Sequence, residues 1–291
     1  MKRAALVLAA LGLAAPAWVG AQTTVDQKRP APPDGAVSIE NMAGSVKVTG
    51  WDTAEVQVKG SVGAGGELRF EGTGKRTHIE IESDRNPMGI KSDLEVYLPF
   101  GSSVEIEGFQ ATISVIGVTG SVKAETVNGS ITQAGTAKVE LQSVNGDVDV
   151  TKAGGRVKAE SVNGSVVLHD ATGELEASTV HGKLQVLGGS YDRAELESVA
   201  GLVRFDAALS PRAALSIETV SGEVELALAA GLGADFAVSS FSGRITNELG
   251  PAATKSGKWT PQSELNFTTG SGGVRVKIET LSGAISIRKR P

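Results

Sequence analysis

The sequence contains no cysteine, and this absence excludes several kinds of chemistry. Without a thiol the chain has no disulfide, no cysteine nucleophile, no thiolate metal site and no cysteine to carry a lipid anchor of the lipoprotein type. Histidine is also rare: only His78, His169 and His181 occur, and no two of them have the spacing that places metal ligands on one face of a helix. Few of the usual catalytic and metal-binding side chains are therefore present.

Aromatic residues make up only 4% of the chain, and basic residues are not in excess, since the formal net charge is −5. A core with few aromatic side chains must be built from small and β-branched residues, which suits strands. Surfaces that bind nucleic acid are normally basic, so the acidic balance argues against such a partner. Glycine is abundant, with 37 residues, and this favours a fold with many tight corners.

The only long apolar run lies at the N-terminus. Lys2 and Arg3 precede an apolar run over residues 4–15, and small residues follow it. This pattern predicts a signal peptide over residues 1–21. The run is shorter than the roughly 20 residues that a membrane-spanning helix needs. We therefore expect an exported protein, periplasmic, cell-surface or secreted, with no transmembrane span after cleavage and a charge of −7 (26 basic minus 33 acidic residues).

A short unit recurs along the chain: a strand, a Ser or Thr, an apolar residue, a small polar residue, a glycine and a second strand. Examples are VKAETVNGSI, VELQSVNGDVDV and VKAESVNGSVVL. Repeats of this length are typical of solenoids, and no helical periodicity competes with them. We predict an all-β fold, a single-chain parallel β-solenoid (β-helix) with about 17–21 residues per coil. The corner glycines are Gly129, Gly146, Gly164, Gly182, Gly201, Gly222, Gly243 and Gly283.

The repeat and its interruptions also predict the organisation of the chain. Regular repeats occupy the middle, looser strands precede them, and a stretch without alternation interrupts the last copies. The looser N-terminal part should contain an insertion that caps the open end of the stack, because unpaired strand edges need cover. The expected parts are a signal peptide (1–21), a linker (22–35), N-terminal coils with the capping insertion (36–119), regular repeats (120–247), a surface loop (248–263) and a C-terminal coil (264–291).

An Asn-Gly pair between strands could instead mark a two-residue hairpin. The residue two before each glycine decides between these interpretations, because it is apolar in every copy. A hairpin would place it opposite mostly polar residues, so we expect a corner that points it into the core, stacked on its counterparts. These residues are Met42, Val127, Val144, Val162, Val180, Val199, Val220, Phe241 and Leu281.

The corner residues should form ladders, because neighbouring coils of a parallel stack lie about 4.8 Å apart. Asn128, Asn145 and Asn163 would form an asparagine ladder that His181 continues. The Ser/Thr column next to it has the parity of the core residues, so its hydroxyls should bond to backbone groups. Asn and Gly also tolerate the left-handed backbone that we expect at these corners.

Four segments carry a resemblance to a known family: the VxxETVNGSI-like repeats, GSVKVTGWDTAEVQVKG, DLEVYLPFGSSVEI and GSGGVRVKIETLSGAISI. In this order they resemble the bacterial putative-adhesin family of β-strand-repeat proteins, which is related to auto-transporter adhesin head domains. The resemblance covers roughly residues 36–290. It implies a β-helical, exported protein and no established chemistry. One departure is Phe109-Gln110, which stands where a turn glycine is expected.

A column of carboxylates four residues before the glycines is the candidate binding face: Glu125, Glu160, Glu197 and Glu218. By alternation these residues face solvent, and neighbouring lysines should pair with several of them. The simplest interpretation is a solvated, partly paired face. The alternative is a stripe that binds divalent cations or cationic ligands, since hard cations need several carboxylate oxygens. No calcium loop of known spacing is present, so we predict no metal site and no cofactor.

Parallel β-helices also include polysaccharide lyases, which need clustered Asp residues and a basic residue on one sheet. Asp147, Asp149 and Asp170 are scattered, and Arg156 or Arg204 would approach them only by chance. No G-x-S-x-G motif is present. We therefore predict no catalytic residues and a non-enzymatic, adhesin-like scaffold of the cell envelope that binds a protein or glycan. A lyase-like carbohydrate-active enzyme remains the alternative, and end-to-end self-association is a further prediction.

Overall fold

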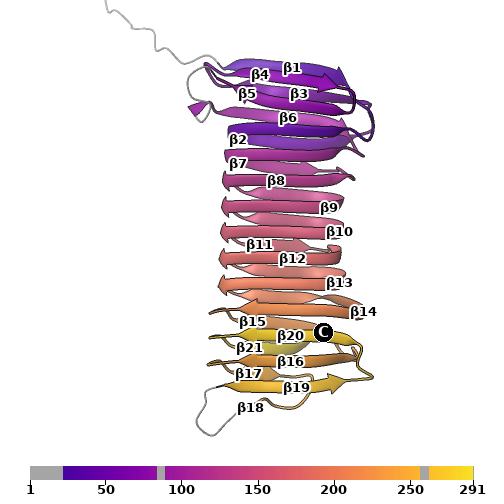
Figure 1. Ribbon diagram of the computed structural model, residues 1–291, viewed down its shortest axis with the longest axis vertical. Helices are drawn as coiled ribbons and strands as arrows, with labels where there is room; N and C mark the ends of the chain where they lie inside the picture. The colour runs from indigo at the N-terminus through magenta and orange to yellow at the C-terminus, as the bar shows by residue number, and fades with distance from the viewer. Residues whose placement is uncertain (1–21, 84–88, 256–261, 291) are drawn as a thin grey trace, which may run out of the picture.

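The computed structural model describes residues 22–83, 89–255 and 262–290, which form a long stack of strands (Figure 1). The predicted all-β class is confirmed, and the strands join in one hydrogen-bonded sheet. The predicted signal peptide lies outside the described residues. None of the described chain forms a helix long and apolar enough to cross a bilayer.

The middle of the stack follows the repeat. Its strands are β8 (Ser121–Asn128), β9 (Ile131–Asn145), β10 (Val148–Asn163), β11 (Val166–His169), β12 (Thr172–His181), β13 (Leu184–Ala200) and β14 (Val203–Thr219). Neighbours pair in parallel, and the register joins equivalent positions of successive repeats. Val157, for example, pairs with Val139 on one side and with Leu175 on the other. We call each such repeat a coil.

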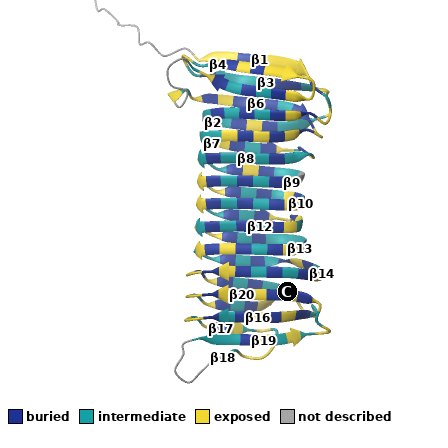
Figure 2. Ribbon diagram, viewed as in Figure 1, coloured by how far each residue is buried: buried dark blue, intermediate teal, exposed yellow. Residues whose placement is uncertain are grey.

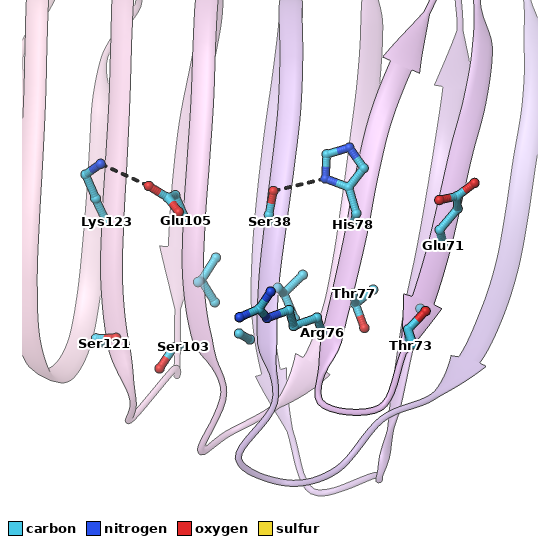
Figure 3. A pocket seen from close by; sticks show the side chains of 14 residues that line it. Ser38, Glu71, Thr73, Arg76, Thr77, His78, Ser103, Glu105, Ser121 and Lys123 are labelled. Carbon is cyan, nitrogen blue, oxygen red and sulfur yellow. Dashed lines mark hydrogen bonds and ion pairs between the residues drawn. The ribbon is translucent and has the colours of Figure 1, made fainter.

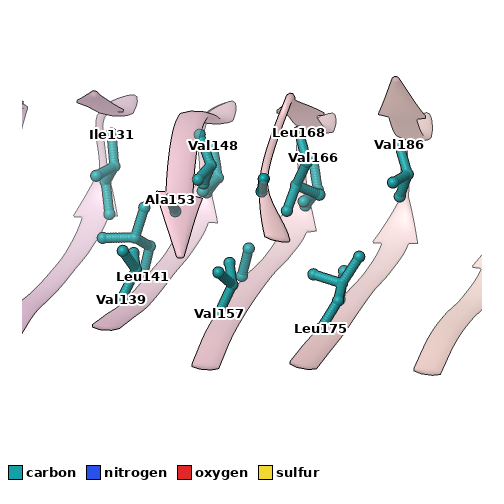
Figure 4. Packing of buried hydrophobic residues seen from close by; sticks show 14 of the residues in the cluster. Ile131, Val139, Leu141, Val148, Ala153, Val157, Val166, Leu168, Leu175 and Val186 are labelled. Carbon is teal, nitrogen blue, oxygen red and sulfur yellow. The ribbon is translucent and has the colours of Figure 1, made fainter. Parts of the chain in front are cut away.

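The core runs through the stack because alternate residues of each strand point inward (Figure 2). In β10, Val148 and Val150, and again Val157 and Ala159, are buried, while the residue between the members of each pair is not. Equivalent apolar side chains therefore stack on one another from coil to coil, as Val139, Val157 and Leu175 do in Figure 4. One coil buries few apolar groups by itself, so its stability depends on its neighbours.

At the N-terminal end the spatial order differs from the chain order. The strands are β1 (Thr23–Pro30), β2 (Ala36–Trp51), β3 (Glu55–Val62), β4 (Glu67–Thr73), β5 (Arg76–Glu82), β6 (Ser92–Pro99) and β7 (Ser103–Ile116). Strand β2 pairs with β7 on one side and with β5 and β6 on the other, so residues 55–99 lie beyond it. The linker prediction for residues 22–35 was wrong over β1, which pairs antiparallel with β3. Its exposed charges and Pro30 suit an edge strand.

The C-terminal coil is inserted between two earlier ones. The strands here are β15 (Val224–Ala229), β16 (Ala234–Ser240), β17 (Ile245–Asn247), β18 (Thr254–Lys255), β19 (Ser263–Thr269), β20 (Val274–Thr280) and β21 (Ile285–Arg290). Strand β20 lies in parallel between β14 and β16, and β21 lies between β15 and β17. Strand β19 then covers β16 in the antiparallel direction, with the rings of Phe236 and Phe267 stacked at 4.4 Å.

The apolar residue two before each corner glycine faces solvent, so the prediction that this column is buried was wrong. Strand β10 continues to Asn163, and its alternation therefore points Ser161 inward and Val162 outward. The chain turns at the Asn-Gly pair itself, one residue later than we expected. The most exposed members are between 40% and 55% accessible, and they are Val144, Val162, Val199, Val220, Phe241 and Leu281.

At the corners of Gly146 and Gly164, glycine is required by close approach rather than by a left-handed backbone. A Cβ added at Gly146 would lie 2.1 Å from the carbonyl oxygen of Gly129, and one at Gly164 would lie 2.1 Å from that of Gly146. Neither glycine has a positive φ. Left-handed residues instead form a second column at the next corner, where Lys152 (φ 56°) and Asp170 (φ 53°) occupy equivalent positions.

We expect Gly146→Ala to destabilise the fold by about 1–3 kcal/mol, because the added methyl forces the backbones of two coils apart. Gly72→Ala is the matched control, since an added Cβ there meets nothing closer than 3.7 Å. Urea denaturation followed by circular dichroism measures both variants. Equal midpoints for Gly146→Ala and the native protein would contradict the close approach of the corners.

Tyr191 is buried against Phe205, and its hydroxyl has no hydrogen-bond partner in the described chain. Burial, and secondly the charge of Asp170, raise the pKa of this phenol. Because the folded state favours the neutral phenol, stability should fall as the pH rises above about 10, the ordinary tyrosine pKa. Tyr191→Phe should be neutral or stabilising at pH 7 and should reduce that alkaline loss. Thermal melts at pH 7 and above pH 10 test this, and a clearly lower melting temperature of Tyr191→Phe at pH 7 would contradict it.

Candidate functional site

The exposed apolar column borders a long hollow at one edge of the stack. Glu160 and Val162 are two residues apart on one face of β10, and the same pair of columns recurs in neighbouring coils. Two hollows of ≈ 410 Å³ and ≈ 630 Å³ lie between these columns and share Ser178 and Val180, so they adjoin. We call them together the edge groove. Its apolar column comprises Val127, Val144, Val162, Val180, Val199, Val220, Leu281 and Phe241.

Backbone hydrogen bonds keep the column continuous through the inserted C-terminal coil. The amide of Ser221 donates to the oxygen of Val199 (2.8 Å), and that of Ser282 donates to Val220 (2.8 Å). The amide of Ser242 then donates to Leu281 (3.1 Å). The order along the groove is therefore Val199, Val220, Leu281 and Phe241, which differs from the order in the chain.

A row of mostly acidic residues forms one wall of the groove. The pairing brings Glu107, Glu125, Gln142, Glu160, Ser178, Glu197, Glu218 and Glu279 into one ladder. All four predicted binding-face residues, Glu125, Glu160, Glu197 and Glu218, belong to this row. Stacked carboxylates one coil apart repel one another, so the row attracts cations.

Lysines on the next outward column neutralise part of this row. Lys123 lies 3.0 Å from Glu125 and 2.9 Å from Glu105, and Lys158 lies 3.1 Å from Glu160. Hydrogen bonds to these carboxylates raise the pKa of both lysines, which therefore stay charged. Lys277 bridges Glu218 (3.1 Å) and Glu279 (3.0 Å) in the same way.

Some carboxylates of the row stay unpaired. Within the described ranges, Glu107 and Glu197 have no ion-pair partner. The described part of the chain also includes no group of three or more His, Asp or Glu side chains that could hold a metal ion. The row therefore suits a cationic partner that brings several separate charges better than it suits a single cation.

An amide ladder follows the valine column at the strand ends. The Nδ2 of Asn145 donates to the Oδ1 of Asn128, and the Nδ2 of Asn163 donates to the Oδ1 of Asn145, both at 2.9 Å. His181 continues the column as the backbone partner of Asn163. The predicted asparagine ladder is therefore present in the structure, at the corner one residue past the valine column.

Buried hydroxyls below the groove tie successive coils together. Ser143 donates to the carbonyl of Gly129 (3.0 Å), Ser161 to that of Gly146 (2.9 Å) and Thr179 to that of Gly164 (2.9 Å). The hydroxyl of Ser198, at the next equivalent position, is buried without a partner. This column is structural, because its hydroxyls point away from solvent.

A second hollow of ≈ 650 Å³ lies at the N-terminal end (Figure 3). There Ser38 Oγ is 3.1 Å from His78 Nδ1, and His78 Nε2 is 3.2 Å from Glu80 Oε2. No sequence pattern pointed to this cluster, since only the stacking of β5 on β2 brings Ser38 and His78 together. A serine nucleophile also needs hydrogen-bond donors, from backbone amides or side chains, to stabilise an oxyanion. Strand β2 pairs on both sides at Ser38, so its amides are already used.

The residues weighed for lyase chemistry have other partners. Arg156 lies 3.5 Å from Glu176, and Arg204 lies 3.3 Å from Asp206. Burial, followed by the charge of Asp147, raises the pKa of Asp149. The arginines are therefore engaged by carboxylates other than the aspartates that lyase chemistry would require.

Comparison with known proteins places the chain in a family. The family model described as Toastrack DUF4097 matches residues 36–288. This chain belongs to the Toastrack DUF4097 family. The match includes the whole edge groove and the N-terminal hollow, so both lie within the Toastrack region. No curated protein matches the sequence.

Several solved structures are similar to this Toastrack chain at low identity. A putative adhesin from Bacteroides fragilis is 11% identical, with a TM-score of 0.44, and the match covers 92% of this chain and 99% of that one. A putative adhesin from Parabacteroides distasonis is 9% identical, with a TM-score of 0.44 and coverage of 92% and 98%. A protein from the same organism titled as a putative lipid binding protein is 11% identical, with a TM-score of 0.36 and coverage of 92% and 98%.

The buried hydroxyls supply a matched pair of variants. Ser161→Ala should destabilise the protein by about 1 kcal/mol, because it removes the hydrogen bond from a buried hydroxyl to the half-buried carbonyl of Gly146. Ser198→Ala should cost little or be stabilising, because it removes a buried hydroxyl that has no partner. Chemical denaturation of the two variants side by side measures the difference. The same loss in both variants would show that the hydrogen bond between coils contributes nothing.

Proposed function

We propose that this Toastrack protein is an exported, non-enzymatic β-solenoid that acts as an adhesin-like binding scaffold of the cell envelope for a protein or glycan partner. The edge groove carries this proposal. Among the described residues eight large hydrophobic side chains are strongly exposed, and six of them lie in its single apolar column. Scattered exposed apolar residues are ordinary, whereas a contiguous group marks a surface that another molecule covers.

The stack also explains why such a surface would be long and uniform. Each coil contributes one apolar and one polar or acidic position to the groove, and the register repeats them in line. Solenoids commonly use extended surfaces of this kind for binding. A binding scaffold therefore needs no other element of the fold to move or to carry out chemistry.

Export is supported by the sequence pattern of residues 1–21. On this basis we place the mature protein outside the cytoplasm, in the periplasm, at the cell surface or in the medium. A relation to auto-transporter adhesin head domains and end-to-end self-association remain predictions.

A photo-reactive amino acid at Val162 tests the proposal in the native envelope. We expect ultraviolet light to link this position to one identifiable partner, because Val162 lies in the groove and is exposed. The control is the same amino acid at Ile116, which is 44% exposed but lies outside the groove. Equal capture from both positions, or none from Val162, would argue against a binding groove. Release of unsaturated uronides by the purified protein, lost in Asp147→Ala, would contradict the non-enzymatic assignment.

A further inference from the structure

We infer that the edge groove binds a cationic amphipathic α-helix of about 19 residues, which lies along the stack with its apolar face on the valine column and its lysines or arginines on the carboxylate row. This inference rests on the proposed function and specifies the chemistry of the partner. Three features carry it: the length of the exposed column, the charge beside it and the direction of the strands.

The length of the column matches a helix of ordinary size. Without the half-buried Val127 at its end, the column runs from Val144 to Phe241 through Val162, Val180, Val199, Val220 and Leu281. These six steps of about 4.8 Å extend over about 29 Å. A helix rises 1.5 Å per residue, so about 19 residues cover the same distance. One helical turn (5.4 Å) also advances nearly as far as one coil, so an apolar stripe on the helix can follow the column.

The charges beside the column select a cationic partner. Six carboxylates border the groove, and those of Glu107 and Glu197 lack an ion pair within the described chain. The next column toward the corner, Asn128, Asn145 and Asn163, is neutral and its amides bond to one another. A helix with basic residues along one border of its apolar face would therefore place its charges against the acidic row.

The direction of the strands favours a helix over an extended peptide. The strands of the stack run across the groove, and their backbone groups already pair with the neighbouring coils. No strand edge runs along the groove, so a peptide could not add to the sheet there. A helix satisfies its own backbone and needs only a side-chain surface, as in other grooves that bind amphipathic helices.

Two other occupants fit the groove less well. A glycan could donate hydroxyl hydrogen bonds to the carboxylate row, but the hydroxyls over the valine column would lose hydration without a partner. A second copy of this chain would bring the same carboxylate row and the same acidic net charge to the contact, and like charges oppose pairing. Both occupants are outcomes of the experiment below.

The test uses a synthetic 19-residue peptide with leucines on one face and lysines along its border, labelled with a fluorophore. We expect it to bind the native protein, as measured by fluorescence anisotropy, and to gain helical circular dichroism when bound. A matched peptide with glutamate in place of every lysine should not bind. Raising the salt from 0.1 M to 1 M should weaken binding of the lysine peptide, because the screening length falls from about 10 Å to about 3 Å.

Groove variants locate the binding site. Val199→Ser and Glu197→Gln should each weaken binding by about threefold or more, because one removes apolar contact and the other removes an unpaired carboxylate. Both side chains are exposed in the free protein, so neither variant should change the melting temperature. The controls are Ile116→Ser and Glu67→Gln, which change exposed residues outside the groove and should bind the peptide normally.

The outcomes separate this inference from the proposed function. Equal binding of both peptides, no binding of the lysine peptide, or binding that the groove variants leave unchanged would overturn the helix inference. A dimer in sedimentation that Val199→Ser dissociates would assign the groove to a second copy, and capture of a glycan through Val162 would assign it to a glycan.

If Val162 links to an envelope partner while the lysine peptide fails to bind, the helix inference is wrong and the binding-scaffold proposal stands. If Val162 captures nothing, the scaffold proposal itself fails.

Discussion

Parallel, in-register contact between successive coils is the constraint on which the rest of this structure depends. At each Asn-Gly corner the backbones of neighbouring coils approach so closely that a methyl group at Gly146 would lie 2.1 Å from the carbonyl oxygen of Gly129. This contact fixes the register of the strands on both sides of the corner. The fixed register aligns the buried valines, the Ser/Thr hydroxyls and the asparagine amides into ladders, and it also aligns the outward columns that form the edge groove.

Much of this arrangement could be predicted from the sequence, because the repeated unit and its spacing are visible there. The all-β class, the parallel pairing of equivalent positions and the asparagine ladder all follow from the spacing of the Asn-Gly pairs. The exposure of the column at Val162 could not be predicted by counting apolar residues. The inward–outward alternation continues from Ser161 to Val162 before the chain turns. The apolar residue that recurs at this position in every repeat therefore forms a continuous surface and is not part of the core.

Two further features have no local signal in the sequence. Strand β20, from the last coil in the chain, lies between β14 and β16. The repeats are similar to one another, so their sequence does not indicate the order in which the coils stack. The left-handed column has glycine at Gly135 and Gly188, but the equivalent Lys152 and Asp170 hide it in the two coils between them. The Ser38–His78 contact depends on a similar exchange of order at the N-terminal end.

The proposed binding surface follows from the same in-register stacking. A stack that aligns equivalent residues makes a uniform surface wherever one position keeps the same character, and here that position is apolar and lies beside a row of carboxylates. The N-terminal edge carries charged residues and a proline, whereas the side of the stack carries the exposed apolar column. We therefore expect a partner to bind on the side of the stack.

Formation of a disulfide between engineered cysteines tests the stacking order most directly, because the native chain contains no cysteine. Glu218 and Glu279 are register partners in adjacent coils, whereas Ser239 lies beyond Glu279. The account predicts that Glu218→Cys with Glu279→Cys forms a disulfide on mild oxidation. Glu218→Cys with Ser239→Cys should not, because two coils separate them by about 9.6 Å, beyond the roughly 7 Å that a disulfide can bridge. Rapid oxidation of the second pair but not the first would contradict the inserted, in-register stack.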